Sequence, residues 1–150
     1  MRSRRRWTHQ DDGTRVVVFL IGMRVNRWRR VRAWWPVLTA MPRMLRELYA
    51  DPASGLLGHR LLLGAGGPVV VQYWRDRDSL FAYARDPGRQ HRPAWQRFNA
   101  AARTSGGAVG IWHETFDVPA GGSESIYVDM PVSGLAAALG VREPERLAAR

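Results

Sequence analysis

Apolar and polar positions along the chain follow patterns that predict four strands. Residues 15–23 read RVVVFLIGM, a nearly continuous apolar and β-branched run that is typical of a strand buried on both faces. Apolar stretches at 56–63 and 69–74 flank the glycine-rich segment 64–67, which indicates two strands joined by a turn. A further strand is expected over residues 109–118.

Helical spacing of apolar residues separates these strands. Apolar side chains recur at helical spacing between residues 38 and 49, where Pro42 is expected to kink or restart the helix. A short helix is predicted over 78–85, and another over 91–103 with Pro93 in its first turn. The resulting order is strand, helix, strand, strand, helix, strand. It predicts an α+β, ferredoxin-like βαββαβ fold, a four-stranded antiparallel sheet with helices on one face.

The same pattern divides the chain into three parts. We expect a flexible basic arm over residues 1–13, the folded domain over 14–134, and a C-terminal tail over 135–150 whose Ala/Leu/Arg composition is compatible with a helix. A sheet covered on one face only would expose a broad apolar surface on a monomer. We therefore predict a homodimer in which two sheets pair into a barrel.

Composition narrows the function classes. All 23 basic residues are Arg, and with 13 acidic residues the formal net charge is +10. A GC-rich coding sequence favours Arg over Lys without selection for function, and no nucleic-acid-binding motif accompanies the charge, so no nucleic-acid partner is expected. The absence of Cys excludes disulfides, thiolate nucleophiles and Cys-ligated metals or haem. The start of the chain is a poor signal peptide, and the first apolar run is too short to span a bilayer, so we expect a cytoplasmic protein without a membrane partner.

The predicted helix 91–103 carries the best candidates for chemistry. His91, Trp95 and Phe98 lie at i, i+4 and i+7 and share a face, with Asn99 beside them. With Pro93 in the first turn, His91 stands at the helix N-terminus, whose positive dipole end favours a neutral imidazole. Such a ring can act as a base, a hydrogen-bond partner or an iron ligand. From these residues alone, a helix-capping His91 and core packing by the two aromatic rings are favoured.

Strand alternation limits which other side chains can join that face. It sends Tyr73 and Trp74 to opposite faces of one strand, so one of them should face the helices. On the last strand it separates Trp112 from His113, so both cannot face the same pocket. An edge or dimer-contact role for His113 is at least as well supported as catalysis. The four histidines show no metal-ligand spacing, and no metal site is predicted.

Five motifs, taken together and in order, show a resemblance to a known family. They are GLLGHRLLLG (55–64), VQYWRDRDSLFAYARDP (71–87), HRPAWQRFN (91–99), VGIWHETFDVPAG (109–121) and IYVDMP (126–131). Over about residues 14–134 the chain resembles the DUF4188 family, also described as monooxygenase Af470-like. The resemblance implies the dimeric α/β barrel of antibiotic-biosynthesis monooxygenases, with a pocket between helices and sheet.

The resemblance also implies a function. It suggests a monooxygenase acting on a bulky, largely apolar natural-product intermediate of secondary metabolism. The catalytic residues it implies are His91, Trp95 and Asn99, and the substrate-binding residues are Tyr73, Trp74, Phe98 and Trp112. In a cofactor-free reaction His91 would take a proton, Asn99 or an indole N–H would stabilise the oxyanion, and the carbanion would reduce oxygen. Two alternatives stay open: a haem-dependent enzyme with His91 as axial ligand, and a non-catalytic ligand-binding dimer.

Overall fold

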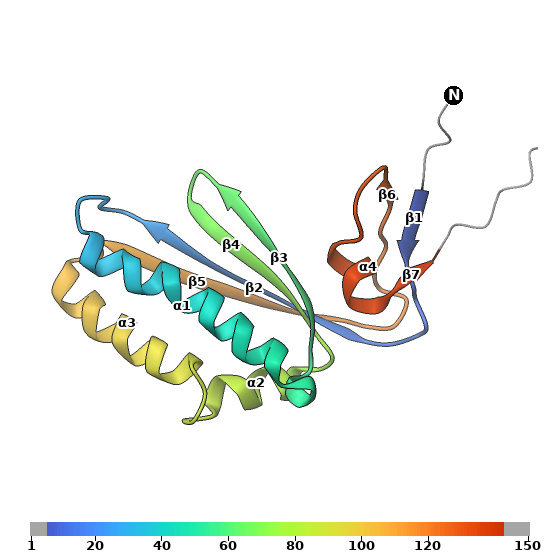
Figure 1. Ribbon diagram of the computed structural model, residues 1–150, viewed down its shortest axis with the longest axis horizontal. Helices are drawn as coiled ribbons and strands as arrows, with labels where there is room; N and C mark the ends of the chain where they lie inside the picture. The colour runs from blue at the N-terminus through green and yellow to red at the C-terminus, as the bar shows by residue number, and fades with distance from the viewer. Residues whose placement is uncertain (1–5, 143–150) are drawn as a thin grey trace, which may run out of the picture.

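A four-stranded antiparallel sheet with the order β3-β4-β2-β5 forms the centre of the computed structural model, which describes residues 6–142 except for the side chains of Ala101 and Ala102 (Figure 1). The strands are β2 (Val16–Val25), β3 (Leu56–Gly64), β4 (Gly67–Trp74) and β5 (Val109–Val118). The two inner strands, β2 and β4, have the most continuous β-branched runs, as expected of strands paired on both edges. The predicted α+β, ferredoxin-like fold is confirmed.

Three helices cover one face of this sheet (Figure 1). They are α1 (Val31–Ala50), α2 (Arg77–Arg85) and α3 (His91–Ser105), and the short 3₁₀ helix η1 (Pro52–Ser54) follows α1. Helix α1 begins seven residues before the predicted start and contains both Pro36 and Pro42 as one helix. Its first turns carry Arg32, Trp34 and Trp35 and lack a regular stripe of apolar residues. The sequence of these turns therefore does not predict a helix by apolar spacing.

The core lies between α1, α2 and the helix-facing side of the sheet. Its fully buried members include Val17, Leu48 and Trp74, packed with Leu80 and Tyr83 of α2. Trp74 is therefore the member of the Tyr73–Trp74 pair that faces the helices, as alternation along β4 allows. This cluster fixes the C-terminal half of α1 and all of α2 against the sheet.

A small unit stands at one end of the sheet (Figure 1). It consists of β1 (Arg6–His9), β6 (Tyr127–Val128), β7 (Val141–Arg142) and α4 (Gly134–Leu139), with the strand order β6-β1-β7. Helix α4 packs on β3, where a Cβ atom at Gly58 would lie 3.4 Å from Ala138 Cβ.

The flexible arm predicted over residues 1–13 is wrong for the part that the structure describes. Residues 6–9 form strand β1, and His9 is only 4% exposed. Its ring nitrogens lie 2.7 Å from the Ser125 hydroxyl and 3.0 Å from the Ser123 hydroxyl. These partners are more than a hundred residues away in sequence, so local composition could not predict the pairing. Residues 1–5 and 143–150, the outer parts of the predicted arm and tail, lie outside the described residues.

Between residues 6 and 142, no helix is both long enough and apolar enough to cross a membrane.

Candidate active site

A cavity of about 890 Å³ lies between α1, α3 and the helix-facing side of the sheet. Its walls are mainly apolar and aromatic. They include Phe19 and Ile21 of β2, Val70 and Trp74 of β4, Leu38 and Met41 of α1, and Trp95 and Phe98 of α3. An apolar cavity of this size with a few polar groups is the usual form of a small-molecule site.

Three histidines line this cavity from three different elements: His59 of β3, His91 of α3 and His113 of β5. His113 lies on β5, which is an edge strand of the sheet as the edge role expected, and its ring also faces the cavity, 5.6 Å from the ring of Phe19. The His59 Nδ1 atom is 2.7 Å from the Tyr49 hydroxyl. Among the described side chains, no group of three His, Cys, Asp or Glu is arranged to hold a metal ion.

The orientation of His91 is set by a hydrogen bond to the end of α2. Its Nδ1 atom lies 3.0 Å from the carbonyl oxygen of Ala84. Because a carbonyl can only accept, Nδ1 carries the proton, and the Nε2 atom of the neutral ring keeps its lone pair. The ring also contacts the Tyr83 ring at a centroid distance of 6.1 Å. His91 therefore has one fixed tautomer and one nitrogen available as a base.

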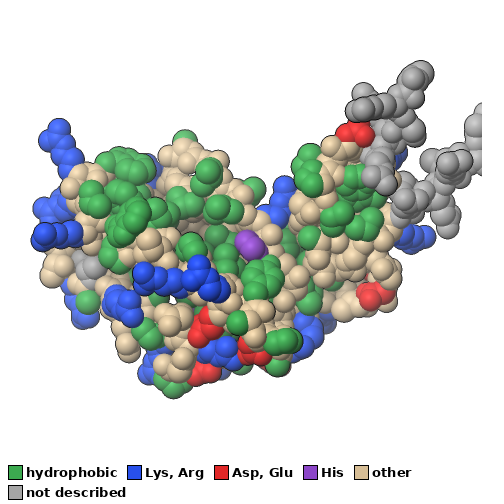
Figure 2. Space-filling model, viewed as in Figure 1, with side chains coloured by type: hydrophobic (Ala, Val, Ile, Leu, Met, Phe, Trp, Pro, Cys, Tyr) green, Lys and Arg blue, Asp and Glu red, His purple; other side chains and the backbone are tan. Residues whose placement is uncertain are grey.

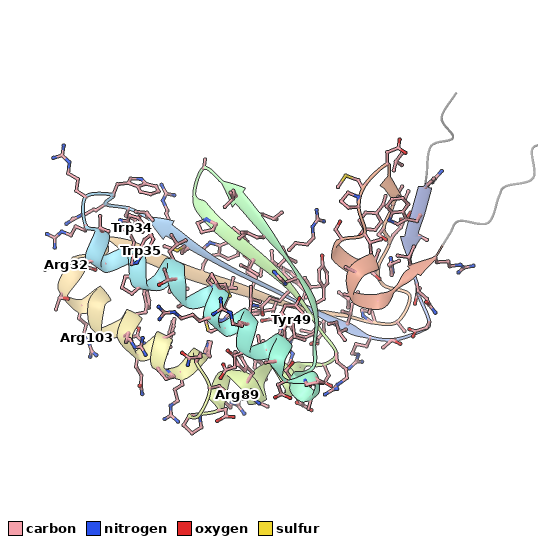
Figure 3. The ribbon with its side chains drawn as sticks, viewed as in Figure 1. Arg32, Trp34, Trp35, Tyr49, Arg89 and Arg103 are labelled. Atoms are coloured by element: carbon pink, nitrogen blue, oxygen red, sulfur yellow. The ribbon has the colours of Figure 1, made fainter. Side chains whose placement is uncertain are left out.

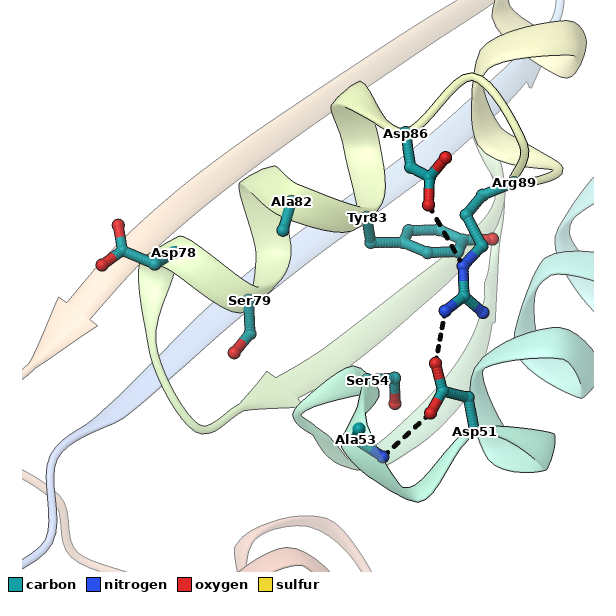
Figure 4. Close-up of a pocket in the computed structure, with 9 residues that line it drawn as sticks. All are labelled: Asp51, Ala53, Ser54, Asp78, Ser79, Ala82, Tyr83, Asp86 and Arg89. Atoms are coloured by element: carbon teal, nitrogen blue, oxygen red, sulfur yellow. Dashed lines mark hydrogen bonds and ion pairs between the residues drawn. The ribbon is translucent and has the colours of Figure 1, made fainter.

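The two residues before His91 are anchored to the C-terminal end of α1. Arg89 forms an ion pair with Asp51, and its Nε atom lies 3.5 Å from Asp86 (Figure 4). The main-chain N–H of Gln90 donates to Glu47 Oε2 at 3.0 Å. Because Arg89, Gln90 and His91 each make a polar contact, the N-terminus of α3 is held at three consecutive positions.

Glu47 also fixes the ring that lies beside His91. The Tyr83 hydroxyl donates to Glu47 Oε2 at 3.0 Å. Burial, together with this carboxylate, holds the pKa of Tyr83 well above its ordinary value, so the phenol stays protonated and remains a donor. Tyr83 separates the large cavity from a smaller one of about 440 Å³, which is the pocket drawn in Figure 4.

Gln72 is a cavity residue that the sequence analysis did not identify. It is 4% exposed and lies on central strand β4, on the same face as Trp74. The Trp74 Nε1–H donates to Gln72 Oε1 at 3.0 Å. Since an indole nitrogen can only donate, this bond assigns the oxygen and turns the amide Nε2 the other way, to a weak 3.7 Å contact with Met41 Sδ. The signal in the sequence was a polar residue at an apolar position of a central strand.

Of the residues singled out on the helix, Trp95 and Phe98 line the cavity, and Asn99 does not. The Trp95 and Phe98 rings stack at 5.5 Å with an interplanar angle of 30°. Trp95 follows His91 by one helical turn and is 44% exposed, so its indole reaches the cavity edge. Asn99 is a further turn along and half-buried outside the lining.

Tyr73 and Trp112 lie on the opposite face of the sheet, so their expected place in the pocket is wrong. Both strands alternate, and the cavity takes Trp74 and His113 instead. The Trp112 indole lies over Gly22 of β2, where an added Cβ atom would come within 2.5 Å of Trp112 Cε2. Sequence alternation correctly stated that only one of Trp112 and His113 could face the pocket, but it could not choose between them.

The cavity wall at the start of α1 is aromatic and includes Trp28, Trp34 and Trp35. Trp34 donates its Nε1–H to the Trp28 carbonyl at 3.0 Å, and its ring contacts those of Trp28 and Trp35 edge-on. Figure 3 places Arg32, Trp34 and Trp35 together at the start of α1, next to the C-terminal part of α3 that carries Arg103.

Comparisons with known proteins place this arrangement in a family. The family model described as Monooxygenase af470-like matches residues 16–135, which is most of the chain. No curated protein matches the chain.

Three solved structures are among those to which the chain is similar. An aldoxime dehydratase (OxdRE), determined with butyraldoxime, is 20% identical with a TM-score of 0.61, and the match covers 93% of this chain but only 38% of that one. SnoaB from Streptomyces nogalater, described as a cofactor-independent oxygenase, is 19% identical with a TM-score of 0.47 over 67% of this chain and 90% of its own. A dimeric ferredoxin-like protein of unknown function from Jannaschia sp. CCS1 is 18% identical with a TM-score of 0.47, and the match covers 66% of this chain and 97% of that one. The dehydratase supports the fold, and this chain spans well under half of that protein's length.

Proposed function

The chain belongs to the monooxygenase af470-like family, and from that premise we propose that it oxidises a bulky, largely apolar natural-product intermediate bound in the 890 Å³ cavity. The family supports a general oxidative role. The observation that carries the finer proposal is the fixed tautomer of His91, which leaves Nε2 as a base at a cavity with mainly apolar walls.

The reaction that fits these groups needs no external reductant. His91 Nε2 takes a proton from an acidic C–H group next to a phenol or enol, and the resulting carbanion reduces O₂ and bonds to it. The peroxide takes a proton, and loss of water with the second C–H proton leaves a carbonyl. A CH₂ group and O₂ thus become C=O and H₂O, and the substrate supplies all four electrons. An apolar cavity assists because it keeps water from the reactive intermediates.

A hydrogen-bond donor is needed for the developing oxyanion. We assign this part to the Trp95 indole N–H, which lies one helical turn from His91, or to the Gln72 amide. Trp28 and Trp35 also line the cavity, but they lie at its other end, near the start of α1, whereas the N–H groups of Trp34 and Trp74 already have acceptors. Asn99, the other candidate from the sequence, lies outside the lining and would act only through neighbouring residues.

Oxygen consumption with a panel of phenols and enols of polycyclic size tests the proposal. His91→Ala should lower the rate by about 10²–10⁴-fold, the usual contribution of a general base. His91→Asn is the matched variant, because its amide can keep the hydrogen bond to Ala84 while removing the distal nitrogen. It should be as inactive as His91→Ala and more stable. A rate unaltered in both variants would remove His91 from the mechanism, and retained ligand without turnover would favour the non-catalytic binding dimer.

A haem-dependent reaction with His91 as axial ligand is the second candidate. The observation that favours it is the same one: a histidine whose Nδ1–H is held by a carbonyl presents Nε2 for iron, a common outer-shell arrangement. The bound group would supply redox chemistry at the iron. Hemin titration decides between the candidates, since a Soret shift that is lost in His91→Ala supports haem binding and no shift contradicts it.

A homodimer that covers the second face of the sheet is part of this proposal. Leu62, Trp112 and Phe116 on that face are 44%, 39% and 50% exposed. An apolar surface of this kind marks an interface in soluble proteins. Size-exclusion chromatography with light scattering should give a dimer at micromolar concentration, and Phe116→Glu should give monomer. A monomeric wild type would contradict the dimer.

A cytoplasmic location is also proposed, and cell fractionation of the source organism tests it.

A further inference from the structure

We propose that the cavity selects an amphiphile with an anionic group, which Arg43 of α1 and Arg97 of α3 bind while the apolar walls hold the rest of the molecule. The inference rests on the proposed function in taking this cavity as the substrate site, and it specifies the substrate class. A carboxylate, sulfonate or phosphate on an otherwise apolar body has the required chemistry.

The charge of the cavity lining is one-sided. Arg43 and Arg97 are the charged side chains among the described residues that line it, and no carboxylate of those residues does so. The remaining lining is apolar, aromatic or uncharged at neutral pH, apart from the three histidines. A ligand that fills this cavity therefore meets positive groups and no negative ones.

Neither arginine has an anionic partner within the described part of the chain. The arginines known to form ion pairs there include Arg75, Arg77 and Arg89, and neither Arg43 nor Arg97 is among them. Glu47, one helical turn after Arg43, already accepts from the Tyr83 hydroxyl and the Gln90 N–H. Helix α3 contains no acidic residue at all. The guanidinium groups stay charged at every physiological pH, so a counter-charge has to come from solvent ions or from a ligand.

The surrounding surface has the same sign. No Asp or Glu occurs between residues 13 and 46 or between 87 and 113, the two segments that carry most of α1 and all of α3. The arginines of these segments are Arg15, Arg24, Arg27, Arg29, Arg30, Arg32, Arg43 and Arg46 in the first, and Arg89, Arg92, Arg97 and Arg103 in the second. Helices α1 and α3 pack side by side, and Figure 2 shows arginine side chains spread over this layer. The field at the cavity therefore attracts anions.

The competing explanation is that the two arginines cover apolar surface with their aliphatic stems and leave their charges in water. Both side chains are exposed, so the charge effect on binding is expected to be moderate. A test must therefore compare ligands that differ in charge alone.

Two fluorescent probes make that comparison. 1-Anilinonaphthalene-8-sulfonate is anionic, and N-phenyl-1-naphthylamine has the same ring system without the sulfonate. Both are titrated into wild type, into the Arg43→Gln/Arg97→Gln variant and into Arg46→Gln/Arg92→Gln. The last pair is the matched control, because it removes two arginines from the same helices outside the cavity lining. Ala94→Trp, which fills the cavity from α3, shows whether a probe binds there.

Wild type should prefer the sulfonate, and Arg43→Gln/Arg97→Gln should raise its Kd about tenfold, which corresponds to about 1.4 kcal/mol. The neutral probe should change less than about twofold, the control variant should bind both probes as wild type does, and Ala94→Trp should weaken both. Equal losses for the two probes, an equal loss in the control variant, or sulfonate binding unaffected by Ala94→Trp would overturn the proposal. These titrations need no turnover. A failure of oxygen consumption therefore leaves this inference standing, and a missing anion preference in an active enzyme overturns this inference alone.

Discussion

The hydrogen bond between Trp74 and Gln72 can be tested by a double-mutant cycle. The change is Gln72→Leu, made in wild type and in Trp74→Phe. In wild type it removes the acceptor that lies 3.0 Å from the Trp74 Nε1–H and leaves this fully buried donor unpaired. An unpaired buried donor costs about 1–3 kcal/mol. The loss of the weak contact to Met41 Sδ adds little.

In Trp74→Phe the indole N–H is absent, so Gln72→Leu should cost about 1 kcal/mol less there than in wild type. Trp74→Phe alone should also destabilise, because the smaller ring leaves a void beside Leu48 and Tyr83. Urea unfolding of the four proteins measures the free energies. For a chain of this size, a loss of 2 kcal/mol appears as a Tm lowered by roughly 4–8 °C. Strict additivity of the two changes would refute the reasoning, because the Gln72 amide would then not be held by Trp74.

Three further changes test other parts of the structure. Leu48→Ala removes a side chain that is 1% exposed and should cost about 2–5 kcal/mol in urea unfolding; a loss below about 1 kcal/mol would contradict the packing of α1 on the sheet. Gly22→Ala places a Cβ atom 2.5 Å from Trp112 Cε2 and should displace that indole from the exposed face of the sheet. Analytical ultracentrifugation should then show a weaker dimer, and an unchanged dimer would contradict the role of this face in dimerisation. The hydrogen bond and ion pair from Arg89, together with a main-chain N–H, lower the pKa of Asp51, so its contribution to the free energy of unfolding is present above the unfolded pKa and is lost as pH falls through the folded pKa. The Tm difference between wild type and Asp51→Asn should therefore shrink below about pH 4. A Tm difference that grows below that pH would contradict the lowered pKa.

The fold could be predicted because its four main strands have clear sequence signals. Apolar β-branched runs and the glycine-rich turn at 64–67 gave four strands in the observed order, with β5 at its predicted bounds. The start of α1 and strand β1 could not be predicted. The first has no apolar stripe over Arg32 to Trp35, and the second is a four-residue strand whose partners are β6 and β7, more than a hundred residues away.

The site was partly predictable from the periodicity of its helix and strands. His91, Trp95, Phe98 and Trp74 line the cavity, because helical and strand periodicity place them on one side. Periodicity fixes which residues share a face, but not which face of β5 meets the helices. For this reason the prediction placed Trp112 in the cavity, where the structure has His113.

Gln72 was missed because its importance as a cavity residue depends on a hydrogen bond that the sequence does not reveal. Only the Trp74 hydrogen bond distinguishes an oriented amide from a solvated one. The hydrogen bond from His91 to Ala84 is similar, since it joins two helices whose spacing the sequence does not give.

The central claim is that neutral His91 carries its proton on Nδ1 and offers Nε2 to the cavity. Nitrogen-15 NMR of histidine-labelled protein, with His91 assigned by comparison with His91→Asn, reads this directly. The account predicts a protonated Nδ1 and an unprotonated Nε2 in the neutral ring. A proton on Nε2 would contradict it, because that nitrogen could then neither take a proton from a substrate nor bind iron.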